Sequence, residues 1–148
     1  MSDVAATPEV IAKEFQAAHD QGPLAACELM VAYMAPEVEV RHDPPVDFDT
    51  KHPREMLAAH RANEIAALSK GLVDYQEIAT VSARGDEVVV DKTVSGRLAD
   101  GESVSASYQL VYTIRDGEIV AALGNMDSGA GDAMRRMLEA GGFTVASS

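Results

Sequence analysis

The hydrophobic period of this sequence changes near Leu72, and that change limits the possible folds more than any other feature. From there onward apolar residues recur at every second position, which is the period of a half-buried β-strand. Three turn signals, Arg84-Gly85-Asp86, Asp100-Gly101 and Asp116-Gly117, divide the stretch into four segments. Segments joined by tight turns pair antiparallel, so the sequence predicts a four-stranded antiparallel meander.

Helical patterning precedes the meander. Thr7-Pro8-Glu9 has the order of an N-cap, a first-turn proline and a first-turn acid, so we expect a helix to begin there and to end before Gly22-Pro23. The same reasoning from period and breakers predicts a helix over 24–36, a short strand over 38–42, a helix over 53–70 and, after the meander, a helix over 130–140. This order of elements predicts an α+β fold.

The size and balance of the chain favour one core. It has 148 residues, of which 47% are hydrophobic, and we find no repeat, low-complexity tract or linker in it. We therefore expect a single domain over 1–148. Residues 1–6 are small and polar and are expected to be disordered.

Charge narrows the range of partners. The 24 acidic and 12 basic residues give a net charge of −12, which repels nucleic acid and anionic membranes. No run approaches the ~18 apolar residues of a membrane helix. The start of the sequence lacks signal-peptide features, and the lone Cys27 has no partner for an internal disulfide, so we expect a cytoplasmic location.

Several blocks of residues carry a resemblance to a known family. They are Gly22, 36–40, Asp43-Pro44, 85–96, and 112–120 leading to Asp127. With these blocks the chain resembles the nuclear transport factor 2-like superfamily, particularly its ketosteroid isomerase-like and SnoaL-like branches. The resemblance implies a cone in which a curved antiparallel sheet wraps three N-terminal helices around an internal pocket, with a short C-terminal helix. The fold hosts isomerases, cyclases, dehydratases, epoxide hydrolases and proteins without catalytic activity. The resemblance is therefore specific for the fold and weak for the function.

Asp43 lies where the steroid-isomerase branch keeps a catalytic carboxylate, and the resemblance implies a general base there. Alternation with Val38 and Val40 instead places His42 inward and Asp43 outward unless a bulge intervenes, so only one of the two is expected to face the pocket. The alternative is a simple turn in which Asp43 caps its own backbone. Phe15 stands where that branch has an oxyanion-donating tyrosine and has no hydroxyl, so a true ketosteroid isomerase is not expected.

Lys92 is the least expected residue of the meander because it alternates with valines on the inner face. An unpaired ammonium there costs several kcal/mol, so we expect it to meet a polar ligand or a carboxylate. The candidate carboxylates are Asp127, Asp43 and Glu64. Alternatively a bulge turns Lys92 outward, or its stem packs while its charge reaches water.

The helix over 53–70 carries a second anomaly. Arg61 falls near the middle of its apolar arc, with Glu64 beside it and His60 at the edge. Arg61 pairs either with Glu64 or with a strand carboxylate, or else Arg61 or His60 faces a ligand. If His60 met Asp43, the two would form a carboxylate-oriented imidazole, which is a sound general base.

Further polar residues fall on inward stripes. Tyr108 and Tyr112 do so in one strand, and Asn125 and Asp127 do so if the last strand alternates regularly. They would either orient a ligand's carbonyl or hydroxyl, or, for the tyrosines, simply pack in the core. The loop cluster of His42, Asp43, Asp47, Asp49 and His52 lacks a recognised ligand spacing, so no metal is expected, and no nucleotide fingerprint points to a cofactor.

Two functions follow from these features. The first is an enzyme that performs cofactor-free acid–base chemistry on a small, largely apolar molecule, of isomerase, cyclase, dehydratase or hydrolase type. The second is a non-catalytic small-ligand-binding or dimerisation module of the same fold. A homodimer is expected through the partly apolar outward strand face of Val111 and Thr113, because sheets pair this way in the families that the chain resembles.

Overall fold

Ten helices and strands make up the part of the chain that the structure, a computed structural model, describes, residues 6–143. They are α1 (Pro8–Gln21), α2 (Pro23–Tyr33), β1 (Met34–Asp43), β2 (Lys51–Pro53), α3 (Arg54–Gly71), β3 (Val73–Arg84), β4 (Glu87–Arg97), β5 (Ser103–Arg115), β6 (Glu118–Asn125) and α4 (Ser128–Ala140). The expected disorder of 1–6 falls, except for Ala6, outside these residues.

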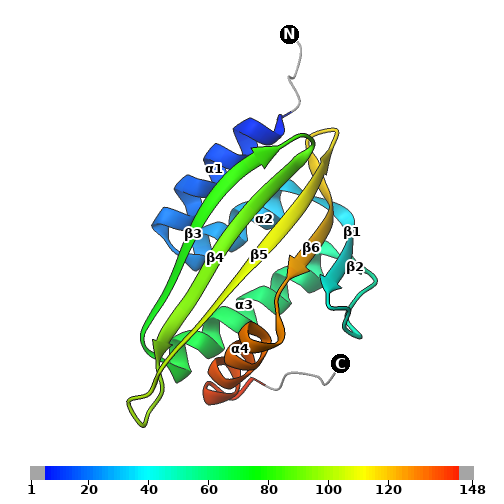
Figure 1. Cartoon of the computed structure of the whole chain (residues 1–148). Coiled ribbons are helices and arrows are strands. Elements are labelled where there is room, and N and C mark those ends of the chain that lie inside the picture. The colour runs from blue at the N-terminus through cyan, green and yellow to red at the C-terminus, as the bar shows by residue number, and fades with distance from the viewer. Residues whose placement is uncertain (1–5, 144–148) are drawn as a thin grey trace.

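The strands form a single sheet in the order β2-β1-β6-β5-β4-β3 (Figure 1). The predicted antiparallel meander is confirmed as β3 to β6. The complete sheet is mixed, because β1, which lies outside the meander, pairs parallel to β6. Strand β1 also begins at Met34 instead of residue 38, and the short β2, which pairs with β1, was not expected.

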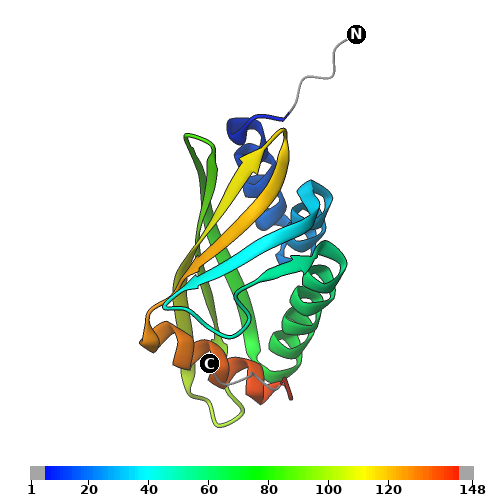
Figure 2. The ribbon, with the colours of Figure 1, turned by 90° about the vertical axis from the view of Figure 1, so that its right-hand side faces the viewer.

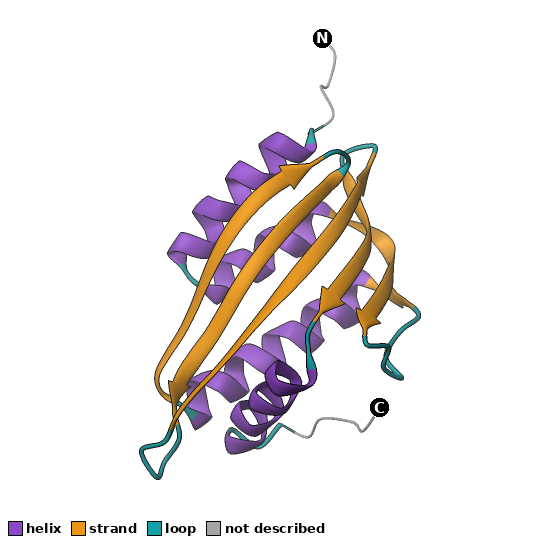
Figure 3. Ribbon diagram, in the orientation of Figure 1, coloured by secondary structure: helices purple, strands orange, loops and turns teal. Residues whose placement is uncertain are grey.

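The helices leave one face of the sheet open. Figures 2 and 3 show α1, α2 and α3 along one face, with α4 across the end of the sheet beside α3. Local sequence explains two helix starts: the Thr7 hydroxyl accepts a hydrogen bond from the Val10 amide at 3.3 Å, and Asp127 caps α4. The result is the expected α+β arrangement of a curved sheet wrapped around helices.

The core between the sheet and the helices has two apolar clusters with polar residues between them. On β4, Val90 belongs to one cluster and Val94 to the other, and Lys92 lies between them. On α3, Leu57 and Leu68 are divided between the same two clusters, with Arg61 between them in sequence. Lys92 and Arg61 thus lie at the boundary between the two apolar clusters, and this boundary is the position of the candidate site.

A bulge in β6 reverses the expected facing of its last residues. Thr113 pairs with Ala121 but Ile114 pairs with Ile119, so Val120 is an extra residue in β6. The prediction that Asn125 faces inward is therefore wrong. Asn125 pairs with Gln109 on the outer face and donates a hydrogen bond to its side-chain oxygen at 3.2 Å.

Candidate functional site

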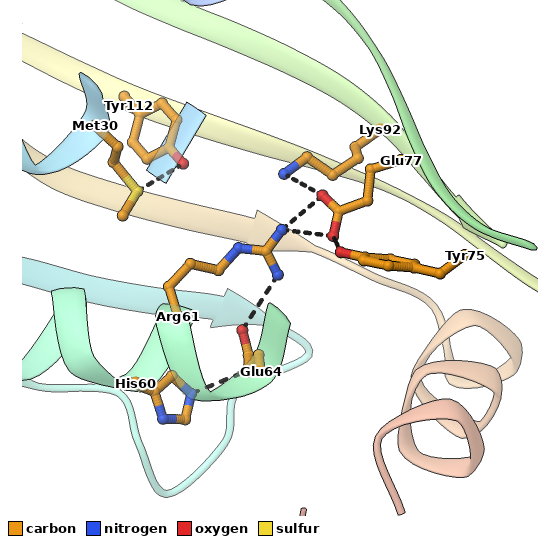
Figure 4. Close-up of polar contacts among 8 residues, drawn as sticks. All are labelled: Met30, His60, Arg61, Glu64, Tyr75, Glu77, Lys92 and Tyr112. Carbon is orange, nitrogen blue, oxygen red and sulfur yellow. Dashed lines mark hydrogen bonds and ion pairs between the residues drawn. The ribbon is translucent and has the colours of Figure 1, made fainter. Parts of the chain in front are cut away.

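Lys92 is buried on the inner face of the sheet, as its alternation predicts, and is 6% exposed. Its Nζ atom lies 3.3 Å from Oε1 of Glu77 (Figure 4). Glu77 comes from β3, where it is two residues from Ala79, the register partner of Lys92. The prediction that Asp127, Asp43 or Glu64 pairs with Lys92 is wrong, because the acid that reaches it is on the neighbouring strand β3.

Arg61 reaches the same carboxylate from α3. Its Nη2 atom lies 2.6 Å from one oxygen of Glu77 and 2.8 Å from the other, and its Nη1 atom lies 3.5 Å from Glu64 (Figure 4). The expected alternatives for Arg61 thus both occur, because it pairs with Glu64 and with a strand carboxylate. The hydroxyl of Tyr75 also donates to Glu77.

His60 continues this arrangement toward solvent. Its Nε2 atom lies 3.5 Å from Glu64, and its side chain is 38% exposed, whereas that of Glu77 is 2% exposed. Within the described chain, the carboxylate beside His60 is therefore that of Glu64 and not that of Asp43, with which we had considered a pair. We call His60, Arg61, Glu64, Glu77 and Lys92 the charged cluster.

Burial and pairing shift the pKa values of the cluster in opposite directions. Burial penalises the charge on Glu77, but Arg61 and then Lys92 outweigh it and hold the pKa of that carboxyl below its ordinary value. For Lys92, burial and the positive charge of Arg61 outweigh the attraction of Glu77 and lower its pKa to about 8. The pKa of His60 is raised, chiefly by its hydrogen bond to Glu64.

Two tyrosines of β5 line the cluster from the sheet side. Tyr108 is the register partner of Lys92, and burial raises the pKa of its hydroxyl. Every fully buried side-chain nitrogen and oxygen in residues 6–143 has a hydrogen-bond partner. Tyr108 itself packs against the second apolar cluster. Tyr112 donates to Sδ of Met30 at 3.4 Å and packs edge-on against Phe15 with ring centroids 5.7 Å apart.

A second polar group lies at the other side of the inner face. Nδ1 of His42 lies 2.6 Å from Oδ1 of Asp49, while Oδ2 of Asp49 accepts hydrogen bonds from the amides of His42, at 3.0 Å, and Val46, at 3.2 Å. Burial opposes the charge on Asp49, but these bonds outweigh it and lower the pKa of the carboxyl. Asp49 therefore stays charged and fixes the imidazole, with Nδ1–H as donor and Nε2 as acceptor.

The imidazole of His42 lies over Gly124 of β6. A Cβ atom at Gly124 would come within 3.0 Å of Cδ2 and 3.5 Å of Nε2 of His42, and within 3.7 Å of Leu110, whose side chain packs against the core. His42 shares its face of β1 with the buried Val38 and Val40. Its ring thus stands at the inner side of the sheet and is half-buried, with 35% of the side chain exposed.

Comparison with known proteins agrees with this architecture. The pattern of the SnoaL-like domain matches residues 12–122. The chain belongs to the SnoaL-like domain family. No curated protein matches its sequence significantly.

Solved structures share the fold of this SnoaL-like domain. An NTF2-like protein from Burkholderia thailandensis superposes with a TM-score of 0.60 at 20% identity, covering 86% of this chain and 97% of its own. A candidate SnoaL-like polyketide cyclase from Jannaschia has a TM-score of 0.59 at 15% identity, with 93% and 97% covered. A protein with a ketosteroid isomerase-like fold from Catenulispora acidiphila, solved with trimethylamine, has a TM-score of 0.54 at 16% identity, with 93% and 95% covered.

The remaining expected site residues of the SnoaL-like domain lie elsewhere. Asp43 is exposed at the end of β1, on the face opposite His42. Asp127 accepts a hydrogen bond from the amide of Ala130 at 2.8 Å, so its side chain caps α4 instead of facing a pocket. Phe15, 1% exposed, is part of the core. The expected grouping of inward polar residues thus holds for Lys92, Arg61 and the two tyrosines of β5.

Both histidines of the expected loop cluster contact other residues of the loop. Nδ1 of His42 donates a hydrogen bond to Asp49, and the ring of His52 stacks on Phe48 with ring centroids 4.1 Å apart. Within residues 6–143, no group of three or more His, Cys, Asp or Glu side chains is arranged to hold a metal ion. No described helix of the SnoaL-like domain is both long and apolar enough to cross a membrane.

Sequence reasoning missed Glu77, and it named Asp49 in the loop cluster without predicting its pairing with His42. The sequence did carry a signal for Glu77. Tyr75, Ala79 and Val81 occupy the same face of β3 as Glu77, so the period of two places an acid among apolar residues on the inner face. Asp49 had no such signal. Its place beside His42 depends on the path of the loop between β1 and β2, which has no period.

Proposed function

We propose that this SnoaL-like domain binds a small, largely apolar molecule between its sheet and helices and performs cofactor-free acid–base chemistry on it, with His42 as the general base. The observation that carries the proposal is the geometry of His42 and Asp49. A charged carboxylate holds Nδ1–H at 2.6 Å, which leaves the lone pair of Nε2 directed away from it and available to take a proton.

The surroundings of His42 suit a carbonyl compound. Leu110 supplies an apolar wall beside the imidazole. We propose that the hydroxyl of Tyr108, two residues along β5 from Leu110, donates a hydrogen bond to the carbonyl oxygen. Removal of a proton next to a carbonyl places negative charge on that oxygen, and a nearby donor lowers the barrier to this step. Isomerisation, cyclisation and dehydration all begin with such a proton transfer.

Non-catalytic binding is the second candidate, and one observation favours it. The fully buried polar atoms of the described residues are satisfied within the protein, which is typical of a structural ion network. In that case the interior holds a ligand passively or only supports the fold. The two candidates differ in whether proton transfer depends on His42.

The test is hydrogen exchange at the carbon next to a carbonyl. We expect the wild-type protein to accelerate deuterium incorporation into cyclohexanone or acetophenone in D₂O, followed by proton NMR, above the buffer rate. H42Q returns the rate to that of buffer, and D49N lowers it by ~10-fold or more because the imidazole loses its orientation.

The matched control is H52Q, which changes a neighbouring histidine outside the pair and keeps the wild-type rate. Equal exchange by H42Q and the wild-type protein contradicts the acid–base proposal. Absence of acceleration by the wild-type protein, together with ligand-induced thermal stabilisation, favours the binding module.

We also propose that two copies associate through the outer sheet face. A groove of about 480 Å³ lies on that face, and the residues that line it include Thr80, Thr93, Ser107 and Gln109, with Asp91 as an acid and Lys92, whose ammonium pairs with Glu77 on the inner face. On a chain with a net charge of −12, such a weakly charged face is the surface on which a second copy meets least repulsion. The whole chain is proposed to be one domain in the cytoplasm.

A further inference from the structure

The five groups of the charged cluster pair unequally. Arg61 contacts Glu77 at 2.6 and 2.8 Å, and His60 lies 3.5 Å from Glu64. These two pairs use both carboxylates. Lys92 is the fifth group, and it reaches only one oxygen of Glu77, at 3.3 Å, which Arg61 already holds more closely (Figure 4).

Because Arg61 holds Glu77 more closely, Lys92 loses little electrostatic attraction when its amine releases a proton. The groups that act on its charge come from several elements: Arg61 and Glu64 from α3, Glu77 from β3, and His19 from α1, whose pKa Lys92 helps to lower. Arg61 lies closer to Glu77 than Lys92 does, and its positive charge together with burial disfavours a second positive charge on Lys92. The pKa of Lys92, lowered to about 8, agrees with this balance.

We propose that Lys92 is a nucleophilic amine that forms an imine with an aldehyde or ketone bound inside the cone. The inference rests on the proposed function in one respect, because it requires that a small carbonyl compound enters the interior. It goes beyond that function because it proposes that the carbonyl ligand becomes covalently attached to Lys92. Lys92 suits this role because its side chain is buried on the inner face and its Nζ atom is the least closely paired cation on Glu77, at 3.3 Å against 2.6 Å for Arg61.

The reaction needs no oxidant or reductant. The neutral Nζ atom attacks the carbonyl carbon, a carbon–nitrogen bond forms, and the carbonyl oxygen takes up a proton to give a carbinolamine. Loss of that oxygen as water then forms the carbon–nitrogen double bond, so that one ligand and one amine give one imine and one water. In this step Glu77, 3.3 Å from Nζ, takes the proton that the nitrogen releases, and Tyr108, the register partner of Lys92 on β5, is proposed to donate the proton to the oxygen.

Reductive trapping tests the inference on the wild-type protein. Benzaldehyde and sodium cyanoborohydride at pH 8 convert an imine into a stable benzylamine, which peptide mass spectrometry locates. The chain has three other lysines, Lys13, Lys51 and Lys70, all exposed. At limiting benzaldehyde we expect Lys92 to be labelled at least ~10-fold more than these, because an ordinary lysine is almost fully protonated at pH 8.

K92M is the matched variant and removes the label at position 92 without adding a new one. Labelling of Lys92 at or below the level of the exposed lysines overturns the inference. If Lys92 is not labelled preferentially while hydrogen exchange of the ketone still depends on His42, the imine proposal is contradicted and the proposed acid–base function stands. If Lys92 is labelled while exchange is independent of His42, the acid–base function fails and the imine stands.

Discussion

At the scale of single residues, the buried ammonium of Lys92 makes an unfavourable contribution to the free energy of folding. Its pKa of about 8 lies below the ~10.4 of an exposed lysine, so the unfolded chain binds the proton more tightly than the folded one. The difference corresponds to on the order of 3 kcal/mol against folding at pH 7. Removal of the ammonium leaves Glu77 paired with Arg61 and Tyr75, so no acid is left alone.

The first residue-scale prediction concerns stability against pH. Below pH 8 both states hold the proton and the penalty is complete, and between pH 8 and 10.4 only the unfolded state still holds it, so the stability of the wild-type protein rises relative to K92M. We expect K92M to be at least as stable as the wild-type protein at pH 7, with the difference shifting toward the wild-type protein by pH 10. Urea unfolding of both proteins at the two pH values measures this.

K70M serves as the control, since Lys70 is exposed and its substitution leaves the pH dependence unchanged. A K92M protein less stable than wild type at pH 7 by more than ~1 kcal/mol contradicts the prediction, because it makes the ammonium a net contributor to the fold.

At the scale of elements, the ends of α3 and α4 approach backbone to backbone. A Cβ atom on Gly141 would lie 1.9 Å from the carbonyl oxygen of Ala67, and one on Gly71 would lie 2.4 Å from the amide nitrogen of Gly141. Both glycines are therefore required by the crossing itself. This contact holds α4 against α3 at the end of the sheet, where Met134 and Met137 complete the second apolar cluster.

G141A is expected to lower the free energy of unfolding by about 1–3 kcal/mol, since the helices must move apart to admit the methyl group. Thermal unfolding followed by circular dichroism measures the loss. G131A, within the same helix, is the control: its Cβ atom meets nothing closer than Sδ of Met126 at 3.9 Å, and alanine favours helix, so it raises stability by ~0.5–1 kcal/mol. A G141A protein as stable as wild type is incompatible with the helix contact described.

At the scale of the whole molecule, one face of the sheet is covered by helices and the other is open (Figure 2). The covered face holds the charged cluster and His42. The open face carries short polar side chains such as Thr93 and Ser107, whose hydroxyls lie 2.8 Å apart across β4 and β5. This division would keep the proposed small-molecule site and the proposed dimer surface on opposite faces of the sheet.

S107R tests the proposed dimer. We expect sedimentation equilibrium to give twice the chain mass for the wild-type protein at micromolar concentration and a single chain mass for S107R, because an arginine on each copy places like charges and bulk in the contact. The control S69R puts the same side chain on an exposed position of α3 and remains dimeric. A monomeric wild-type protein rules the dimer out.

The sequence by itself determined the order of the elements other than β2, the four-stranded meander and the inward facing of Lys92, because these follow from local period and turn residues. Alternation also placed His42 and Asp43 on opposite faces. The tertiary structure alone decided the partners. Glu77 meets Lys92 through strand pairing and Arg61 through helix packing, Asp49 meets His42 through a loop, and the bulge at Val120 turns Asn125 outward. Such contacts depend on register and on the paths of distant segments, which a local pattern does not encode.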